Sequence, residues 1–432
     1  MKKYNKPNRK EWTKLIQRPV FDKTSLVQTV SSILENVKQN GDVALKKYTA
    51  EFDGIKLNDL AVSEAEIVKA RNEVSQELKA AIQVAYDNIK KFHEAQQLEN
   101  TEIETTTGVK CWRKSVAIEK VGLYIPGGTA PLFSTILMLG IPAKIAGCQE
   151  IILCTPCDMK GEINTAILYT VELVGIKKIY KLGGAQAIAA MSFGTETIPQ
   201  VYKIFGPGNQ YVTKAKELVQ ANGVAIDMPA GPSELLVIAD KTCNPEFVAA
   251  DLLSQCEHGI DSQVILLSGN QSIIDKTVIA INEQVENLPR KAIALQALHN
   301  SKAILLDTIQ DCIQFSNLYA PEHLILAIDN VKKQSNNITN AGSVFLGNYS
   351  CESAGDYASG TNHTLPTNGF AKNYSGVSLD SFVKKITFQE ITKTGLNNIG
   401  KAIEVMAEAE ELIAHKNAVT IRLQSIKNES NV

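Results

Sequence analysis

The amino-acid sequence predicts an α/β protein with two similar, incomplete Rossmann-like domains of open parallel sheet. A helical N-terminal arm and a small C-terminal helical extension complete the expected fold. Two series of short apolar runs, each run separated from the next by a helical stretch, carry this prediction. Such alternation is typical of parallel sheets that are covered by helices. The chain of 432 residues, with 44% hydrophobic residues, can bury the cores of several domains.

The segment before the first series predicts an arm with short helices over residues 1–60, followed by one long helix. Ser63 and Glu66 form a capping box that opens this helix. Its apolar residues recur at helical spacing, which indicates one buried face. They are Ile67, Val74, Leu78, Ile82, Ile89 and Phe92. His93, beside two lysines at the far end, is expected to be solvated.

The two series of apolar runs predict the strands of the two sheets. The first series has runs at 121–125, 150–155, 178–182 and 201–205, with helices expected at about 133–147, 161–174 and 184–192. The second has runs at 235–240, 264–268, 303–307 and 324–328, with helices at about 245–257, 271–286 and 330–337. A long polar loop at 349–376, a strand-like run near 383–388 and an amphipathic helix from about 396 to 415 follow.

The charge pattern and the N-terminus exclude several classes of protein. The net charge is -2, and no basic stripe indicates a nucleic acid or a membrane surface as a partner. The N-terminal residues have no apolar segment of a secretion signal. The most apolar stretch, around 129–147, is interrupted by prolines, a glycine and a lysine, so it is not expected to span a bilayer. We expect a cytoplasmic protein.

The eight cysteines are expected to be reduced in such a protein. Cys154 and Cys157 form a C-x-x-C motif, but no second pair follows at zinc-ribbon spacing. Buried or incidental thiols are therefore favoured over a metal or redox site. Cys256 is judged to point away from the face shared by Gln255 and His258, which argues against a thiol nucleophile.

Four polar segments could carry chemistry. Gln255 and His258 are three residues apart and share one helix face, although glutamine is an uncommon zinc ligand. Glu322 and His323 precede an apolar run and could supply two proton acceptors, or form a solvated loop pair. Two further pairs are candidate ligands for a metal or a substrate. They are Asp356 with His363, and Glu410 with His415.

The last of these pairs raises a geometric difficulty. Glu410 and His415 are separated by roughly 140° around a regular helix, so they cannot both point at one ion.

Nucleotide binding is indicated only weakly by the glycines. Residues 206–211 contain the first two glycines of a G-x-G-x-x-G motif, but Tyr211 replaces the third. Glycine turns at 125–129 and 183–186 end predicted strands. Ligands of open α/β sheets bind at the carboxyl ends of the strands, so these turns modestly favour a nucleotide crevice.

Eight segments together resemble the histidinol dehydrogenase family, in the family's order and over almost the whole chain. The matching segments are residues 122–128, 183–189, 206–209, 230–234, 253–258, 319–324, 355–363 and 409–418. The resemblance implies a zinc-containing, NAD-dependent enzyme that oxidises histidinol to histidine in two steps. It also implies a homodimer whose active site takes Glu410 and His415 from the second subunit.

The resemblance assigns a role to each candidate residue. It makes Glu322 and His323 the catalytic acid–base pair. The implied zinc ligands are Gln255, His258, Asp356 and His415. The implied substrate contacts are Ser233, Gln255, His258, His323, Asp356, His363, Glu410 and His415. The implied NAD contacts are Tyr124, Gln186 and Asn209.

With these roles, the expected domains can be given. They are an arm at 1–24, a discontinuous α/β domain at 25–120 with 235–375, an NAD-binding α/β domain at 121–234, and an extension at 376–432 that reaches the partner subunit. Two other readings remain open. A zinc hydrolase would use Glu322 as base without a nicotinamide, and a non-catalytic metal- or nucleotide-binding protein would keep only the fold.

Overall fold

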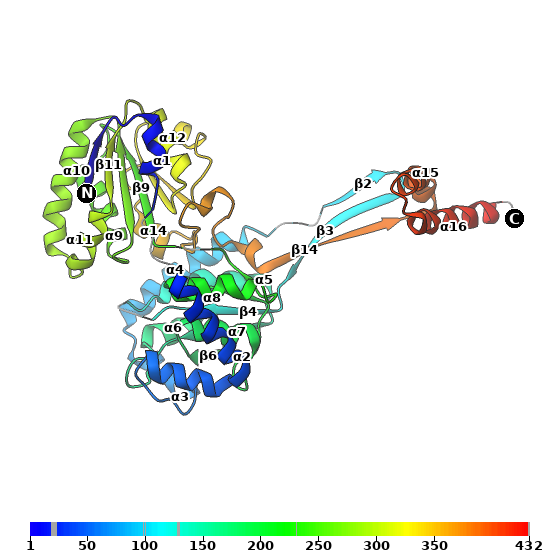
Figure 1. The fold of residues 1–432 in the computed structure, drawn as a ribbon, viewed down its shortest axis with the longest axis horizontal. Helices are drawn as coiled ribbons and strands as arrows, with labels where there is room; N and C mark the ends of the chain where they lie inside the picture. Colours follow the sequence, from blue (N-terminus) through cyan, green and yellow to red (C-terminus); the bar gives the residue numbers. More distant parts are fainter. Residues whose placement is uncertain (19–23, 98, 100, 128–129, 230, 431–432) are drawn as a thin grey trace. The chain divides into compact units, whose positions relative to one another are not determined.

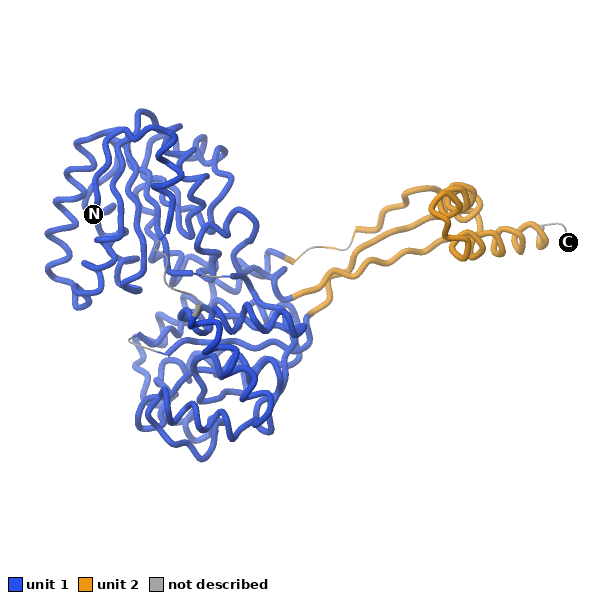
Figure 2. Tube along the Cα trace, in the orientation of Figure 1, with its two compact units in different colours: residues 1–96, 118–382 blue, residues 97–117, 383–432 orange. Residues whose placement is uncertain are grey.

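The computed structural model describes residues 1–18, 24–97, 99, 101–127, 130–229 and 231–430 (Figure 1). The chain forms two compact units, which are coloured separately in Figure 2. The first unit comprises residues 1–96 and 118–382, and the second comprises residues 97–117 and 383–432. Each unit is described by itself below.

The first unit contains two parallel sheets with the same strand order. The five-stranded sheet has the order β6-β5-β4-β7-β8, and the six-stranded sheet has the order β1-β11-β10-β9-β12-β13. Apart from β1, each sheet thus places its third, second, first, fourth and fifth strands side by side, which is the Rossmann order without its last strand. This confirms the prediction of two similar, incomplete Rossmann-like sheets. The strands are β1 Lys2–Asn5, β4 Lys120–Tyr124, β5 Glu150–Thr155, β6 Lys178–Lys181, β7 Lys203–Phe205, β8 Ala225–Ile226, β9 Glu234–Ala239, β10 Gln263–Ser268, β11 Lys302–Leu305, β12 His323–Ala327 and β13 Ser343–Leu346.

Helices cover both faces of the six-stranded sheet (Figure 1). Leu235 and Val237 of β9 pack with α9, α10 and α11, whereas Leu236 and Ile238 pack with α1 and α12. Successive side chains of a strand point to opposite faces, so a strand between two helical layers needs an unbroken apolar run. The helices of this half are α1 Arg9–Leu15, α9 Pro245–Cys256, α10 Gln271–Gln284, α11 Lys291–His299, α12 Ile309–Tyr319, α13 Val331–Ser335 and α14 Glu352–Tyr357.

The five-stranded sheet is covered in the same way. One face packs with α4, α5 and α6, and the other with α2, α7 and α8. Residues 25–94, which the sequence analysis groups with the later sheet, pack here instead, because α2, α3 and α4 contact α7, α6 and α5. An amphipathic pattern shows that a helix has a buried face but does not identify the sheet that it covers. These helices are α2 Thr24–Phe52, α3 Glu64–Glu73, α4 Gln76–Glu94, α5 Phe133–Ala146, α6 Thr165–Val174, α7 Gly184–Phe193 and α8 Gln210–Gln220.

The helix predicted after Ser63 is divided into α3 and α4. The capping box of Ser63 with Glu66 is confirmed, and Ser75 caps α4 in the same region. The prediction that His93 is solvated is wrong: its side chain is buried, and its Nδ1 atom lies 2.8 Å from the Ile89 carbonyl oxygen. Phe92, predicted on the buried face, is exposed. Residues four apart share a helix face, so the buried face that contains Ile89 continues at residue 93 rather than at residue 92.

The N-terminal arm begins with a strand that the sequence does not predict. β1 pairs in parallel with β11, so that Lys2 is opposite Lys302. The residues Lys2-Lys3-Tyr4-Asn5 have no apolar run, and the unpaired edge of β11 determines their conformation.

The second unit is an antiparallel sheet with two helices. Its strand order is β14-β3-β2, and most residues of its strands are exposed or half-buried, which explains why the apolar pattern misses β2 and β3. The helix predicted at about 396–415 is two helices, because the chain breaks at Glu411, which has a φ of 60°. The elements are β2 Glu102–Thr106, β3 Val109–Ala117, β14 Val383–Ile391, α15 Lys393–Ala409 and α16 Ile413–Ser430. Within the ranges given above, no helix has the length and apolarity needed to cross a bilayer.

Candidate active site

The amino ends of β9 and β12 bring together Glu234, Glu322 and His323. These strands are neighbours where the strand order of the six-stranded sheet reverses. Glu322 precedes β12, and its Oε2 atom accepts a hydrogen bond of 2.8 Å from the backbone nitrogen of Glu234. The side chain of Glu234 is itself held by Arg18, with 2.7 Å between Nε and Oε1. The predicted substrate residue Ser233 directly precedes β9, so it lies at the same end of the sheet.

His323 is the first residue of β12 and is surrounded by carboxylates. Its Nδ1 atom lies 3.7 Å from Glu322 Oε2 and 3.9 Å from Glu352 Oε1. Its buried Nε2 atom has no hydrogen-bond partner within the described part of the chain, although it lies 3.4 Å from Asp356 Oδ1. Burial lowers the pKa of His323, but Glu352, Glu322 and Asp356 raise it to about 10. Burial raises the pKa of Glu322 to about 8.

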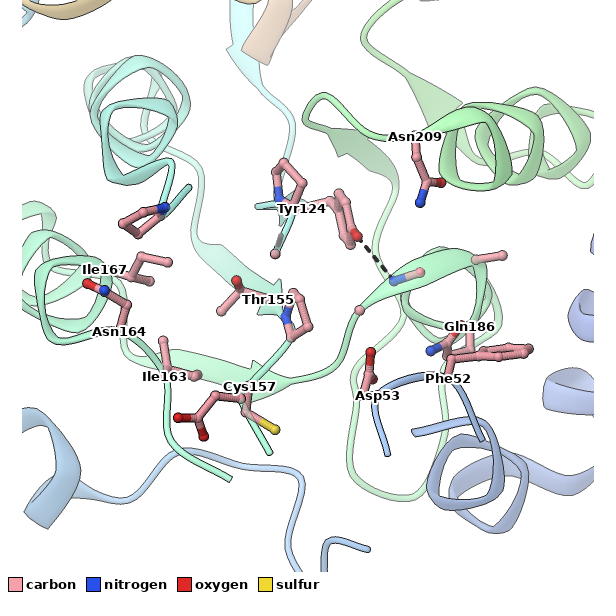
Figure 3. A pocket seen from close by; sticks show the side chains of 18 of the residues that line it. Phe52, Asp53, Tyr124, Thr155, Cys157, Ile163, Asn164, Ile167, Gln186 and Asn209 are labelled. Carbon is pink, nitrogen blue, oxygen red and sulfur yellow. Dashed lines mark hydrogen bonds between the residues drawn. The ribbon is translucent and has the colours of Figure 1, made fainter. Parts of the chain in front are cut away.

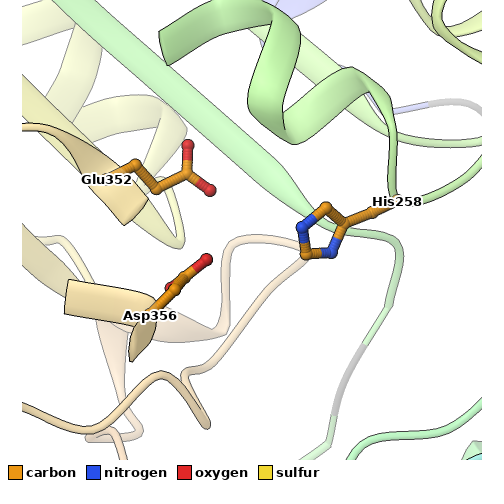
Figure 4. A group of neighbouring side chains, drawn as sticks. All are labelled: His258, Glu352 and Asp356. Atoms are coloured by element: carbon orange, nitrogen blue, oxygen red, sulfur yellow. The ribbon is translucent and has the colours of Figure 1, made fainter. Parts of the chain in front are cut away.

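Three side chains beside this pair form a candidate metal centre (Figure 4). One donor atom from each of His258, Glu352 and Asp356 lies within 4.8 Å of the others. Glu352 and Asp356 are one turn apart on α14, so they share a face, and His258 follows the end of α9. Imidazole and carboxylate groups are common ligands of Zn²⁺, so these residues fit a divalent cation.

Gln255, in the last turn of α9, lies in the same cluster. It is buried, and its amide nitrogen lies 3.4 Å from Glu322 Oε2. With the amide turned over, the nitrogen donates to Glu352 and the oxygen accepts from the Glu234 backbone nitrogen at 3.1 Å, so that both amide atoms are satisfied. His258 lies beyond the end of α9, and its backbone nitrogen donates to the Gln255 carbonyl at 3.3 Å. The structure therefore brings these two predicted ligands together with Asp356.

Glu352 is the residue of this site that the sequence analysis does not name. Its side chain is 1% exposed, and burial raises its pKa well above the ordinary value. The sequence contains one signal that could have identified Glu352: it is a carboxylate four residues before Asp356, and residues at this spacing share a helix face. The expectation of a loop at 349–376 concealed it, since α14 lies within that range.

His363 links the loop after α14 to the half of the unit that contains the five-stranded sheet. Its Nδ1 atom lies 2.9 Å from the Asp356 carbonyl oxygen, and its Nε2 atom lies 3.1 Å from Thr135 Oγ1 of α5. Burial lowers its pKa. The neutral ring fits a role in orienting the neighbouring residues or a ligand.

A cavity of about 1070 Å³ lies at the carboxyl ends of the strands of the five-stranded sheet (Figure 3). The three predicted NAD contacts, Tyr124, Gln186 and Asn209, all line it. The Tyr124 hydroxyl accepts a hydrogen bond of 3.1 Å from the Gly184 nitrogen, and both amide atoms of the buried Gln186 lack a partner among the described residues. Asn209 Oδ1 caps α8. A Cβ atom at Gly206 would overlap the Tyr124 carbonyl oxygen, so glycine is needed there.

The remaining predicted residues belong to the second unit. Glu410 caps the end of α15, and His415 is in the first turn of α16; both are exposed. They lie on two helices, so the 140° separation expected on one regular helix does not apply. Parts of three predicted motifs, at residues 128–129 and 230, lie outside the described residues.

Comparisons with known proteins identify the family. A sequence profile of the histidinol dehydrogenase family matches residues 16–423. A histidinol dehydrogenase of Bacteroides fragilis is 57% identical over 427 residues, covering 99% of this chain and 100% of the relative. One from Shigella sonnei is 49% identical over 99% of this chain and 98% of its own length. The crystal structure of histidinol dehydrogenase from Elizabethkingia anophelis is 63% identical, with a TM-score of 0.97 over 99% of both chains. The chain therefore belongs to the histidinol dehydrogenase family.

Proposed function

We propose that this protein is a zinc-dependent, NAD-linked histidinol dehydrogenase. It would oxidise the CH–OH group of L-histidinol to L-histidinaldehyde and then to L-histidine, the last steps of histidine biosynthesis in the cytoplasm. The observation that carries the proposal is the burial of the Glu322–His323 pair against the cluster of His258, Glu352 and Asp356. Family membership over almost the full length supports the substrate.

The metal would be held by Gln255, His258 and Asp356, with His415 contributed by a second copy of the chain. When bound, the cation would supply a template that holds the imidazole and amine nitrogens of histidinol. Ser233 and His363 would contact the substrate from the same chain, and Glu410 from the second copy. The buried carboxylates offset the charge of the cation, which makes the centre suitable for a divalent ion.

His323 would act first, as the base that removes the hydroxyl proton of histidinol. Its Nε2 atom is buried without a partner among the described residues. The carboxylates of Glu352 and Asp356 raise the pKa of the ring, and a cation held at the same cluster would offset their charge and favour the neutral ring that accepts a proton. The Nδ1 atom lies 3.3 Å from the Glu234 carbonyl oxygen, which can hold the ring in one orientation.

Glu322 would act in the second step, as the base that activates water for addition to the aldehyde. Its Oε2 atom is held by the Glu234 nitrogen, and burial keeps its pKa near the working pH of a general base. Each step removes a hydride and a proton from the substrate, so two NAD molecules are reduced for each histidinol.

The cavity of Figure 3 would hold NAD through Tyr124, Gln186 and Asn209. NAD, when bound, accepts the hydride. The N-cap of α7 is Gly183, which has no side chain to cap the helix, and the Gly184 nitrogen is engaged by Tyr124. The amide groups that follow it at the start of α7 can face the pyrophosphate, and the unpaired amide of Gln186 can bind the same ligand. The phenol of Tyr124 stays protonated, because burial raises its pKa to about 12.

A second copy of the chain is the proposed partner. Large exposed apolar side chains are numerous in the second unit, and exposed apolar groups of this size commonly mark interfaces. They are Ile103, Ile386, Phe388, Ile391, Val405, Met406, Leu412, Ile413 and Ile421. A homodimer that covers them could also complete the active site with Glu410 and His415.

A stoichiometric assay combined with metal analysis tests this function. The purified protein, mixed with limiting histidinol and excess NAD, should produce two NADH and one histidine for each histidinol. Elemental analysis should find one zinc ion in each chain. Histidinol consumption without NADH, or a metal-bound protein that hydrolyses esters or amides instead, would favour the zinc hydrolase.

A further inference from the structure

Asp53, directly after α2, has an oxygen atom that the fold leaves without a partner. Its Oδ2 atom is buried and has no hydrogen-bond partner among the described residues. The side chain lines the cavity of Figure 3 and lies near Gln186 in that view. Burial raises the pKa of Asp53. A buried carboxylate oxygen without a donor is costly, so this atom is suited to a ligand that brings a donor.

The other two acids that line the cavity already have partners of their own. Asp158 Oδ1 accepts hydrogen bonds from the backbone nitrogens of Lys160 and Glu162, at 2.8 Å and 2.9 Å. Glu162 pairs with Lys69 at 2.8 Å. No lysine, arginine or histidine is among the described residues that line the cavity. The described lining residues therefore offer no cation to an additional phosphate group, and Asp53 is the acid among them with a buried oxygen that lacks a partner.

The cavity has two ends, and Asp53 lies at the end that suits an adenosine. In Figure 3, Phe52, Asp53 and Gln186 lie on one side of Tyr124, and Ile163 and Ile167 lie on the other. Pro131 also lines the cavity and leads into α5.

Ile163 and Ile167 pack in one buried cluster with Ile136 of α5, so the end of the cavity that they line is the end next to α5. Thr135 of α5 lies 3.1 Å from His363, which contacts Asp356. A nicotinamide must approach those residues, so the opposite end, near Asp53, is left for the adenosine. Phe52 is 52% exposed there and offers an aromatic ring to a base.

We propose that Asp53 accepts hydrogen bonds from the 2′- and 3′-hydroxyls of the adenosine ribose and thereby selects NAD against NADP. The inference rests on the proposed NAD-dependent function. A carboxylate can accept from both hydroxyls of a ribose, as acidic residues do in other dinucleotide sites. The 2′-phosphate of NADP removes one of these donors and places negative charge against a carboxylate, and none of the described lining residues is a cation that could offset the repulsion.

Calorimetric titration of the zinc-loaded protein with ADP-ribose and with 2′-phospho-ADP-ribose tests the proposal without turnover. The wild-type protein should bind ADP-ribose more tightly. Asp53→Asn should weaken ADP-ribose binding about tenfold, the effect of losing a hydrogen bond to a charged group. It should also reduce the preference over the 2′-phosphate, because the repelling charge is gone. Asp53→Ser should change the preference in the same direction.

Asp59→Asn is the matched control, because Asp59 is exposed, six residues further along, and does not line the cavity. It should keep both affinities, and thermal melting should show that all variants are folded. If the wild type binds ADP-ribose and Asp53→Asn keeps the same affinity and preference, the role of Asp53 is wrong while the proposed function stands. If the wild type binds neither ADP-ribose nor NAD, the NAD-dependent function itself is wrong, and the role of Asp53 with it.

Discussion

The Nε2 atom of His323 lies 3.4 Å from the Oδ1 atom of Asp356, which joins the amino end of β12 to α14. Glu352, one helical turn before Asp356, lies 3.9 Å from the other ring nitrogen. The short helix α14 therefore presents two carboxylates to one histidine. The same two carboxylates belong to the cluster with His258. His323 and the candidate metal centre thus share the carboxylates of Glu352 and Asp356. A substitution in one of them should therefore have a measurable effect on the other.

Glu352→Gln should weaken zinc binding by about 10–100-fold, the usual cost of losing a group that ligates or supports a ligand. The substitution keeps the size of the side chain but removes a charge from the cluster. Competition with a chromogenic chelator measures the affinity. Glu257→Gln is the control, because Glu257 is next to His258 in the chain but outside the cluster. Equal affinities for the two variants would exclude a role for Glu352 in metal binding.

Glu322→Gln should affect aldehyde oxidation more than alcohol oxidation. The amide cannot activate water, whereas His323 remains able to remove the hydroxyl proton. Loss of a general base typically costs about 10²–10⁴-fold, and we expect this loss only in the second step. Supplying histidinol and histidinaldehyde separately, with single-turnover detection of NADH, separates the two steps. An equal loss in both would contradict the division of roles between Glu322 and His323.

Mixed dimers should reveal whether the active site is shared. We expect His415→Asn and His323→Ala chains each to be inactive alone. In a hybrid dimer one site would combine an intact His323 with an intact His415. Random exchange makes half of the dimers hybrids with one working site each, so about a quarter of wild-type activity should return. Subunit exchange must be demonstrated independently with differently tagged chains. Exchange without recovered activity would argue against a shared site.

Cys256→Ala should keep aldehyde oxidation. The thiol is fully buried in the core between α9 and the six-stranded sheet, and burial raises its pKa to about 12. It therefore has neither the access nor the charge of a nucleophile. The variant should lose about 1 kcal/mol in the free energy of unfolding, from the small cavity that alanine leaves. Cys312→Ala, in the core on the other face of the sheet, is the matched control. Loss of aldehyde oxidation by Cys256→Ala alone, with zinc still bound, would restore a thiol mechanism.

Lys302→Met should change how stability depends on pH. Lys302 is buried in β11, where its Nζ atom donates to the Gln17 carbonyl at 3.2 Å. Burial, followed by the charges of Arg18 and Lys2, lowers its pKa from 10.5 to about 8. Between pH 8 and pH 10.5 the Lys302 side chain is protonated in the unfolded chain and neutral in the folded chain. The free energy of unfolding therefore rises with pH over this range. Below pH 8 the lysine is charged in both states, and the folded state carries the full free-energy cost of burying that charge.

The difference between wild type and Lys302→Met measures this effect. Relative to the variant, the wild type should gain up to about 3 kcal/mol in the free energy of unfolding between pH 8 and pH 10.5. Urea denaturation of both proteins across this range gives the comparison, and other titrating groups cancel. Parallel curves for the two proteins would contradict the lowered pKa.

Local patterns were sufficient for most of the two parallel sheets. The run from Glu150 to Thr155 predicts β5 because nearly all of its residues are buried, and burial on both faces requires an unbroken apolar run. The same reasoning misses β1 and β2, whose conformation depends on their neighbours rather than on their own apolarity. The motifs around His258 and Asp356 indicate the family and the residues expected in its active site. The order of such short segments along the chain is enough for this, without any knowledge of the geometry.

Only the tertiary structure brings Gln255 and His258, at the end of α9, next to Glu352 and Asp356 of α14. It also places His323 of β12 beside them. It also assigned α2 to the five-stranded sheet and left the Asp53 oxygen unpaired in the cavity. These relationships join residues that are far apart in the chain. An apolar run or a helical repeat depends on successive residues, whereas a contact between distant residues depends on how whole layers pack.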